Sequence, residues 1–371
     1  MTVLVVGAGF TGCVLAEQLA SAGHLVIVID KRDHIGGNAY DEYDAHGVLV
    51  HRYGPHIFHT NSAAVFEYLS RFTEWLPYEH RVLSQVESKL LPFPINCDTL
   101  NQLYGLTLSE AEAAAFIERV RVPCAILRNS EDVVLTSVGA DLCEKFFRNY
   151  TRKQWGLDLA ELSPSVAGRI PVRSNHDDRY FTDQYQYMPK DGYTALLNRM
   201  LYHRNIELHL GVDYLQHPPA MRPALTFYTG PLDGYFHNRL GALGYRSLRF
   251  EHQHFVSIDR FQPVGTINYP NNYAYTRITE FKHLTGQQIA GTSIVREYST
   301  SQGEPCYPVP TASNEILATR YRALAATQKA VVFAGRLGQY RYLNIDQAVA
   351  SALKAAAPFI NSVRRTNPCL S

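Results

Sequence analysis

The N-terminal stretch TVLVVGAGFTGCVLAEQLASAGHLVIVID, residues 2–30, constrains the fold more than any other part of the sequence. An apolar run at 2–6 meets a glycine turn, and a helical pattern follows that ends at Gly23. A second apolar run, 25–29, ends at Asp30. Strand, glycine turn, helix and strand in this order predict the first unit of a parallel sheet. The chain is therefore expected to be an α/β protein.

The glycine turn has the spacing G-x-G-x-x-G, with Gly7, Gly9 and Gly12. The turn follows a strand and opens a helix, and Asp30 lies 18 residues after Gly12. In this context the pattern predicts a dinucleotide whose pyrophosphate lies at the helix N-terminus and whose ribose is bound by the acid. The alternative is a tight turn that binds nothing.

A second glycine pair, Gly36 and Gly37, follows shortly after the strand that ends at Asp30. Adjacent glycines let backbone approach a ligand closely. A pair at this place is typical of chains that hold FAD, so we expect FAD in preference to NAD.

Composition excludes several classes of function. The chain has 371 residues, 46% hydrophobic and 19% charged, which predicts a globular protein of two or three domains. A net charge of +1 without a basic tract argues against nucleic acid as a partner. No apolar run is long enough for a membrane helix. Six cysteines without metal-ligand spacing predict reduced thiols, no metal and a cytoplasmic protein.

The order of patterns predicts that the cofactor domain is split along the chain. Helices are expected at 61–76, 109–120 and 137–155, and an extended link at 91–96. Aromatic, alternating runs after residue 170 predict an antiparallel sheet. The expected division is a cofactor domain at 1–77, 203–235 and 312–371, a helical insert at 78–143, and an antiparallel-sheet substrate domain at 144–202 and 236–311 with a mobile lid near 161–174.

Two histidines, His56 and His59, follow a Gly-Pro pair in YGPHIFHT. They fit half of a metal site, but no third ligand lies at useful spacing. Packing at a domain interface is a second reading. A third places them beside a cofactor whose charge changes with its redox state.

Three arginines stand out. Arg173 follows SPSVAGRIP, a run of small residues and proline that suits a mobile lid. Arg277 lies in an alternating aromatic strand, as either a solvated edge charge or an anion clamp. Arg336, next to Gly335, is placed to reach the cofactor's pyrophosphate.

Several motifs together resemble one family. GAGFTG, KRDHIGGNAY, YGPHIFHT, NYTRKQWG, RIPVRSNHDDRYF, YTRITEFKH and GRLGQYRYLNID occur in the order seen in bacterial UDP-galactopyranose mutases. The resemblance implies a split FAD domain, a helical insert, an antiparallel sheet and a homodimer. It also implies interconversion of UDP-galactopyranose and UDP-galactofuranose, in which N5 of reduced FAD attacks the anomeric carbon.

The resemblance and the motifs together assign residues. Catalytic roles fall on His56, His59, Arg173 and Arg277, with the two arginines on the substrate diphosphate. The expected substrate-binding residues are Phe146, Tyr150, Thr151, Trp155, Arg173, Tyr180, Tyr185, Arg277, Tyr307, Tyr342 and Asn344. The expected cofactor-binding residues are Gly7, Gly9, Phe10, Thr11, Gly12, Asp30, Lys31, Gly37, Asn38, His56, His59, Gly335, Arg336, Tyr342 and Leu343.

Some assignments keep alternatives. Phe146 and Tyr150 also suit the core face of an amphipathic helix. Asn344 stands where many family members have Asp, and 271–275 (NNYAY) is unusual, so mutases of UDP-N-acetylgalactopyranose or dTDP-fucopyranose fit as well. An amine-oxidase-like flavoenzyme and a nucleotide-sugar-binding protein without catalysis are the competing classes. An external reductant such as NAD(P)H would keep the flavin reduced.

Overall fold

The computed structural model describes residues 1–218 and 223–366, and side chains as far as residue 360. Its first layer is a five-stranded sheet in the order β10-β2-β1-β11-β17, in which all neighbours are parallel. The strands of this sheet are β1 (Thr2–Val6), β2 (Leu25–Asp30), β10 (Ile206–Leu210), β11 (Leu225–Tyr228) and β17 (Val331–Phe333). The predicted α/β class and the return of 206–210, 225–228 and 331–333 to the first sheet are confirmed.

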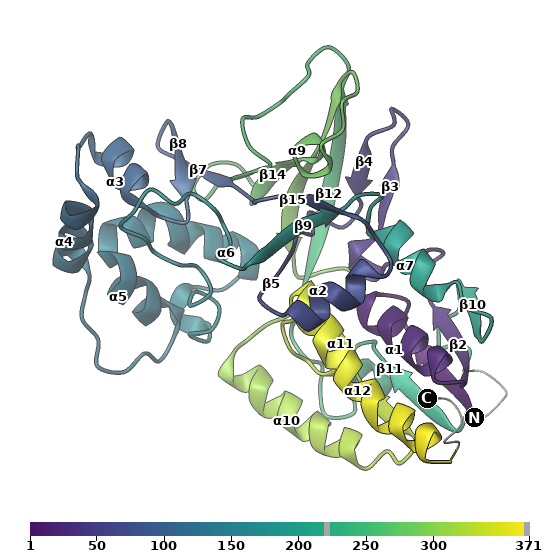
Figure 1. Cartoon of the computed structure of the whole chain (residues 1–371). Coiled ribbons are helices and arrows are strands. Elements are labelled where there is room, and N and C mark those ends of the chain that lie inside the picture. The colour runs from purple at the N-terminus through teal and green to yellow at the C-terminus, as the bar shows by residue number, and fades with distance from the viewer. Residues whose placement is uncertain (219–222, 367–371) are drawn as a thin grey trace.

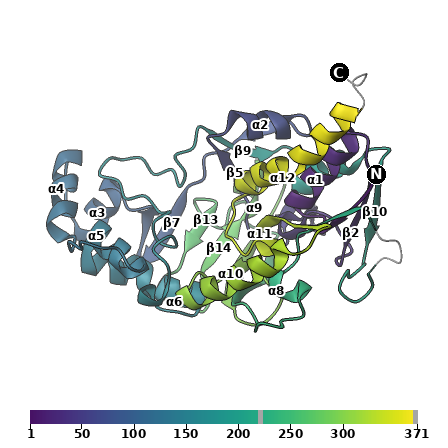
Figure 2. The ribbon, with the colours of Figure 1, turned by 90° about the horizontal axis from the view of Figure 1, so that it is seen from below.

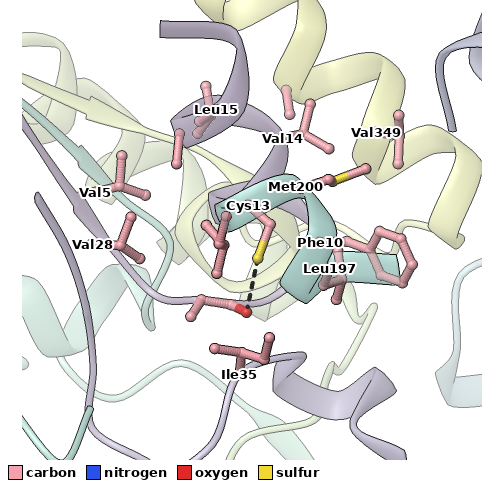
Figure 3. Close-up of a cluster of buried hydrophobic side chains, with 14 of the residues drawn as sticks. Val5, Phe10, Cys13, Val14, Leu15, Val28, Ile35, Leu197, Met200 and Val349 are labelled. Atoms are coloured by element: carbon pink, nitrogen blue, oxygen red, sulfur yellow. Dashed lines mark hydrogen bonds between the residues drawn. The ribbon is translucent and has the colours of Figure 1, made fainter. Parts of the chain in front are cut away.

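Three helices cover this sheet and form the largest core. They are α1 (Phe10–Ser21), α7 (Tyr193–Leu201) and α12 (Ile345–Thr366). In Figure 3, Leu197, Met200 and Val349 surround Cys13, whose Sγ donates a hydrogen bond of 3.2 Å to the Ala8 carbonyl oxygen. Burial raises the pKa of the Cys13 thiol. Cys13 is therefore a packing residue of the helix that follows the glycine turn.

The second layer is a seven-stranded sheet in the order β16-β12-β15-β14-β13-β7-β8. Its pairs are antiparallel except β13 with β7, which run parallel. Its strands are β7 (Val82–Val86), β8 (Lys89–Phe93), β12 (Tyr245–Phe255), β13 (Thr266–Asn268), β14 (Arg277–Glu280), β15 (Thr292–Thr300) and β16 (Tyr307–Pro308). The predicted antiparallel sheet exists, but its edge hairpin β7-β8 comes from the segment expected to be a helical insert.

Smaller elements connect the layers. The two remaining sheets are the hairpin of β3 (Asp41–Tyr43) with β4 (Leu49–His51), and the sheet of β5 (Phe58–Thr60), β9 (Tyr185–Pro189) and β6 (Trp75–Pro77). The other helices outside the insert are η1 (Gly37–Ala39), α2 (Ala63–Ser70), α8 (Leu232–Tyr235), α9 (Phe281–Thr285), the longer α10 (Ala312–Ala326) and α11 (Gly335–Gly338).

The helical insert lies at the opposite end of the molecule from the five-stranded sheet in both views (Figures 1 and 2). It consists of α3 (Cys97–Tyr104), α4 (Glu110–Val120), α5 (Ser130–Leu142), the π-helical turn η2 (Cys143–Arg148), α6 (Asn149–Trp155) and the short η3 (Leu159–Glu161). Its core also contains Val82, Leu91 and Phe93 from the hairpin. The segment 78–143, predicted as a helical insert, therefore also contains the hairpin β7-β8, and the extended link predicted at 91–96 begins inside β8.

Two further boundaries differ from expectation. Ser62 caps α2 and accepts a hydrogen bond from the Val65 N–H at 3.3 Å, but the helix expected over 61–76 ends at Ser70, and 75–77 forms β6. The helix α7, assigned by sequence to the substrate domain, buries Leu196, Leu197 and Met200 in the core of the cofactor sheet. Both boundaries are set by side-chain packing between segments that lie far apart in the sequence, which the local sequence pattern does not reveal.

Among the described residues no helix is both long and apolar enough to cross a membrane. The cysteines at 13, 97, 124, 143 and 306 are free thiols. Cys369 lies outside the described residues.

Candidate active site

A cavity of about 350 Å³ opens at the carboxyl edge of the five-stranded sheet. Glycine turns, the end of β2 and the start of α12 line it. The predicted cofactor residues that line it are Gly7, Gly9, Phe10, Thr11, Gly12, Asp30, Lys31, Gly37, Asn38, His56, Gly335, Arg336 and Leu343. Within the described part of the chain, His59 and Tyr342 do not line this cavity.

The two glycine motifs of the sequence pack against each other at the cavity floor. Gly9 and Gly36 form a parallel bridge, and the Gly36 N–H donates to the Ala8 carbonyl oxygen at 2.8 Å. A Cβ on Gly37 would lie 3.0 Å from the Gly9 Cα, and one on Gly12 only 1.7 Å from the Gly7 carbonyl oxygen. Side chains here would fill the space next to the N-terminus of α1, so the cradle fits the pyrophosphate of a dinucleotide.

Asp30 has a structural task in addition to the predicted ribose contact. Its carboxylate accepts hydrogen bonds from the Ala8 N–H at 2.7 Å and the Arg32 N–H at 2.9 Å. These bonds tie the first glycine turn to the end of β2. Because each carboxylate oxygen accepts more than one hydrogen bond, the side chain still has acceptor capacity toward the cavity.

Sequence reasoning missed Glu304, which also lines the cavity. Glu304, in the loop between β15 and β16, pairs with Lys31 at 2.6 Å and with Arg32 at 2.7 Å. Arg32 also donates to the Asn38 side chain at 3.0 Å. No local motif links residue 304 to residue 32. Sequence reasoning also missed the lining residues 212–215 and 229–231, which follow β10 and β11. Ligands bind at the carboxyl ends of parallel strands, so this rule could have predicted them.

The structure separates the two histidines of YGPHIFHT. His56 lines the cofactor cavity, and its Nδ1–H donates to the Gly54 carbonyl oxygen at 2.9 Å. Burial, with help from His51 and Arg336, lowers the pKa of His56 to about 3, so the ring stays neutral. Because a carbonyl only accepts, Nδ1 carries the proton and Nε2 is an acceptor.

His59 points elsewhere. It lies on β5, contacts the Asp183 carboxylate through Nδ1 at 2.8 Å, and stacks on Phe181 with ring centroids 3.6 Å apart. Among the described residues no group of three metal-ligating side chains occurs.

Arg277 is an anchored cation. On β14, its Nε and Nη2 each donate to the Glu297 carboxylate at 2.9 Å, and Glu297 is 1% exposed. Burial opposes its charge, but Glu297 holds the pKa of Arg277 well above its usual value. This bidentate pair fixes the direction of the guanidinium group. The reading of Arg277 as a solvated edge charge is therefore wrong.

Tyrosines surround this arginine. Tyr150, Tyr180, Tyr307 and Tyr342 all lie within electrostatic reach of Arg277. The rings of Tyr307 and Tyr342 stack with centroids 5.7 Å apart. The structure therefore brings together predicted residues from five distant segments.

Arg336 connects the tyrosine cluster to the cofactor cavity. It lines the cavity, and its guanidinium lies 5.1 Å from the Tyr307 ring and 5.2 Å from the Tyr342 ring. Its Nη2 donates to the Leu343 carbonyl oxygen at 2.8 Å. Asn344, expected at the substrate, also lines the cofactor cavity, where it precedes α12.

Arg173 does not join this cluster. Its Nη1 donates to the carbonyl oxygens of Asp177 at 3.2 Å and Arg179 at 2.6 Å, within its own loop. Its Nη2 is buried and has no partner. Arg173 therefore reaches the cluster only if the segment moves.

The predicted substrate-binding residues on η2 and α6 divide into buried and accessible ones. Phe146, on η2, is 2% exposed and stacks on Phe93. The alternative prediction, that Phe146 is a core residue of its helix, therefore fits the structure. Trp155 and Thr151 are 8% and 7% exposed, whereas Tyr150 is half-buried beside Arg277. Tyr185, on β9, stacks on Phe66 with centroids 4.4 Å apart.

Lys153 fixes the unusual loop at 271–275. Its ammonium donates to the backbone carbonyl oxygens of Tyr269, Asn272 (3.1 Å), Tyr273 (3.2 Å) and Tyr275 (3.2 Å). Burial lowers the pKa of Lys153 to about 8. The loop is thus attached to α6, the helix that carries Tyr150.

Comparison with known proteins agrees with this geometry. Residues 5–72 match a family model described as an NAD(P)-binding Rossmann-like domain, and residues 145–342 match that of UDP-galactopyranose mutase. The chain is 42% identical over 370 residues to the Klebsiella pneumoniae protein named "Probable UDP-galactopyranose mutase", covering 97% of this chain and 95% of that one.

Two further relatives are informative. The dTDP-fucopyranose mutase of Escherichia coli is 35% identical over 378 residues, covering 97% of this chain and 98% of the other. A crystal structure of reduced UDP-galactopyranose mutase has a TM-score of 0.80 at 15% identity, covering 97% and 96% of the two chains. The cofactor assigned to the cavity is FAD, and the chain belongs to the UDP-galactopyranose mutase family.

Proposed function

We propose that this protein is a flavin-dependent mutase that interconverts UDP-galactopyranose and UDP-galactofuranose. One observation carries the proposal: an arginine braced by a buried carboxylate, Arg277 on Glu297, faces a group of tyrosines that Arg336 joins to the FAD cavity. Guanidinium groups bind phosphate oxygens strongly, and phenols supply both stacking faces and hydrogen bonds.

The roles of the substrate residues follow from this placement. Arg277 binds the diphosphate, with Tyr307 and Tyr342 beside it, and Arg173 joins when the lid near 161–174 moves. Tyr150 stacks on uracil, which contributes about 1–3 kcal/mol. Thr151 and Trp155 support that end of the site, Tyr180 lies near the sugar, and Tyr185 and Phe146 act through packing.

When bound and reduced, FAD supplies the nucleophile for the anomeric carbon. The protein then holds the departing UDP close to the sugar, so that return is faster than escape. Arg277 does this without reorienting, because Glu297 fixes it beforehand. His56, neutral and with Nε2 as an acceptor, can accept a hydrogen bond at the cofactor without adding charge.

The test is product analysis. We expect the dithionite-reduced holoenzyme to form UDP-galactofuranose from UDP-galactopyranose, and the oxidised holoenzyme to form none. Chromatography against authentic nucleotide sugars measures both. Failure of the reduced enzyme with UDP-, dTDP- and N-acetylated hexoses together would exclude mutase activity.

A dTDP-fucopyranose mutase is the second candidate, because a relative of that name is 35% identical over 97% of this chain. UDP-N-acetylgalactopyranose is a third substrate for the same panel. An amine oxidase is disfavoured, because Arg336, which lies over the rings of Tyr307 and Tyr342, would repel a cationic amine from the tyrosine cluster.

We further propose that the protein acts as a cytoplasmic homodimer with an external reductant such as NAD(P)H. The free thiols at 13, 97, 124, 143 and 306 support a reducing compartment. We propose a split FAD domain that includes α7, a helical insert resting on the β7-β8 hairpin, and a substrate domain built on the seven-stranded sheet.

A further inference from the structure

The connection between α4 and α5 exposes a cluster of apolar side chains. It runs through RVPCAILR, residues 121–128, and all eight of these residues are exposed. Val122, Ile126 and Leu127 are 45%, 64% and 47% exposed. None of these three described side chains belongs to the core of the insert. Single exposed apolar side chains are common, but three within one short loop form a patch of the kind that marks a binding surface.

The loop is held in this exposed position at both ends. At its start, the Val122 N–H donates to the Leu135 carbonyl oxygen at 2.9 Å. At its end, the Arg128 N–H donates to the Asp132 carboxylate at 2.8 Å, and the Asn129 side chain caps α5. The exposure of the apolar side chains is therefore fixed by contacts of the loop with α5.

Arginines border the apolar run on both sides. Arg119 and Arg121 precede it, Arg128 ends it, and the stretch 119–130 contains no acidic residue. Arg121 pairs with Glu118. No carboxylate of the described residues lies within 4.0 Å of the guanidinium group of Arg119 or Arg128. The patch thus combines apolar side chains with uncompensated positive charge.

This combination fits one kind of occupant better than a second copy of the chain. In a symmetric contact between two copies, the same arginines would come together and repel one another. An anionic lipid surface offers the opposite, because acyl chains accept apolar side chains and lipid phosphates attract the arginines around them. Charge complementarity therefore favours a lipid surface.

The patch lies at the opposite end of the molecule from the cofactor. In both views α4 and α5 are at the end away from the five-stranded sheet, whose carboxyl edge opens into the FAD cavity (Figures 1 and 2). A flat surface that covered the outer end of the insert would therefore leave the cavity accessible.

We propose that residues 121–128 are a docking loop for a membrane surface that contains anionic lipids. The apolar side chains enter the boundary between headgroups and acyl chains, and Arg119 and Arg128 contact lipid phosphates. A patch of this size gives weak, reversible attachment, so the protein is peripheral to the membrane. This inference goes beyond the proposed mutase activity and does not depend on it.

The experiment is sedimentation of the holoenzyme with vesicles of phosphatidylcholine and phosphatidylglycerol in about equal parts, and with vesicles of phosphatidylcholine alone. We expect binding to the mixed vesicles that weakens as salt is added, and little binding to the neutral ones. Ile126→Ser should weaken binding about tenfold, because it removes an apolar side chain that the lipid buries. Arg128→Gln should weaken binding about fivefold, because it removes one cation near the charged surface.

The matched control is Ile316→Ser on α10, because Ile316 is 67% exposed and Ile126 is 64% exposed. This variant should bind the mixed vesicles as the wild-type protein does. All three variants should keep wild-type affinity for UDP in vesicle-free buffer, so the outcome is independent of the mutase proposal.

Two results in the vesicle assay would overturn the docking loop. One is wild-type protein that stays in solution with the mixed vesicles, and the other is equal binding by Ile126→Ser and Ile316→Ser. Sedimentation velocity supplies a third: if Ile126→Ser splits a dimer into monomers, the loop joins two copies of the chain and the lipid proposal is wrong.

Discussion

Glu297 holds Arg277 through two parallel hydrogen bonds of 2.9 Å, and the carboxylate that forms them is 1% exposed. The two residues face each other across neighbouring strands, β14 and β15, in register. The pair orients a cation before any ligand arrives, so binding a phosphate costs little reorganisation. This relationship leads to the first prediction.

Arg277→Lys keeps the charge but loses the planar fork. We expect UDP affinity and kcat/KM to fall at least about tenfold, and the free energy of unfolding to fall by about 1–3 kcal/mol, because one Glu297 oxygen loses its partner. Calorimetry, steady-state kinetics and urea unfolding measure these. Arg296→Lys, next to Glu297 and bonded to Gln253 at 2.7 Å, is the control. If Arg277→Lys and Arg296→Lys lowered UDP affinity equally, the planar guanidinium of Arg277 would have no special role in binding.

Gly12→Ala places a methyl group 1.7 Å from the Gly7 carbonyl oxygen. We expect this protein to purify without flavin, because the turn must open to relieve the clash. Gly23→Ala is the control: its φ of +91° strains a side chain, but no atom lies within 4 Å. That variant should lose about 1–2 kcal/mol of stability and keep its flavin. The ratio of absorbance at about 450 nm to that at 280 nm reports flavin content. If Gly12→Ala purified with a full complement of flavin, the glycine turn would not be the part of the site that holds the cofactor.

His56 should not titrate between pH 5 and 8, because burial and its neighbours lower its pKa to about 3. Nitrogen NMR of the holoenzyme, assigned with His56→Gln, should show a neutral ring protonated at Nδ1. The unfolded chain binds a proton near pH 6.5, so this histidine's contribution to stability is complete above pH 6.5 and is lost as pH falls toward 3. His56→Gln should lose stability less steeply over that range. A midpoint between pH 5 and 8 would disprove this prediction.

Glu280 should control stability in acid. Burial opposes its charge, but hydrogen bonds from His283, Thr292 and the N–H groups of Phe261 and Gln262 lower its pKa to about 2. Since the unfolded value is higher, its stabilisation is present above about pH 4.5 and lost as pH falls toward 2, about 3 kcal/mol in all.

Glu280→Gln should therefore differ from wild type at pH 7 and converge with it in acid. Denaturant unfolding at several pH values tests this, with exposed Glu67→Gln as the control. A difference that stays constant from pH 7 to 2 would show that Glu280 titrates normally.

Local pattern pointed to part of the cofactor site. Thirteen of the fifteen residues that the motifs and the family resemblance together assigned to the cofactor line one cavity. The glycine turns and strand ends among them have a local signature. The hairpin β7-β8 was missed although Val82, Ser84 and Val86 alternate as buried positions, because the prolines at 92 and 94 favoured a link. The ion pairs of Glu304 with Lys31 and Arg32 have no local signature, because the partners lie far apart in the chain.

The sequence by itself determined the α/β class, the dinucleotide cradle and the choice of Arg277 as a clamp candidate, because each depends on residues adjacent or regularly spaced in the chain. Only the tertiary structure decided that Glu297 braces Arg277, that His56 and not His59 faces the cofactor, and that Arg169 and not Arg173 lies over Tyr342. Those outcomes depend on distances between segments far apart in the chain, which packing sets and local spacing does not encode.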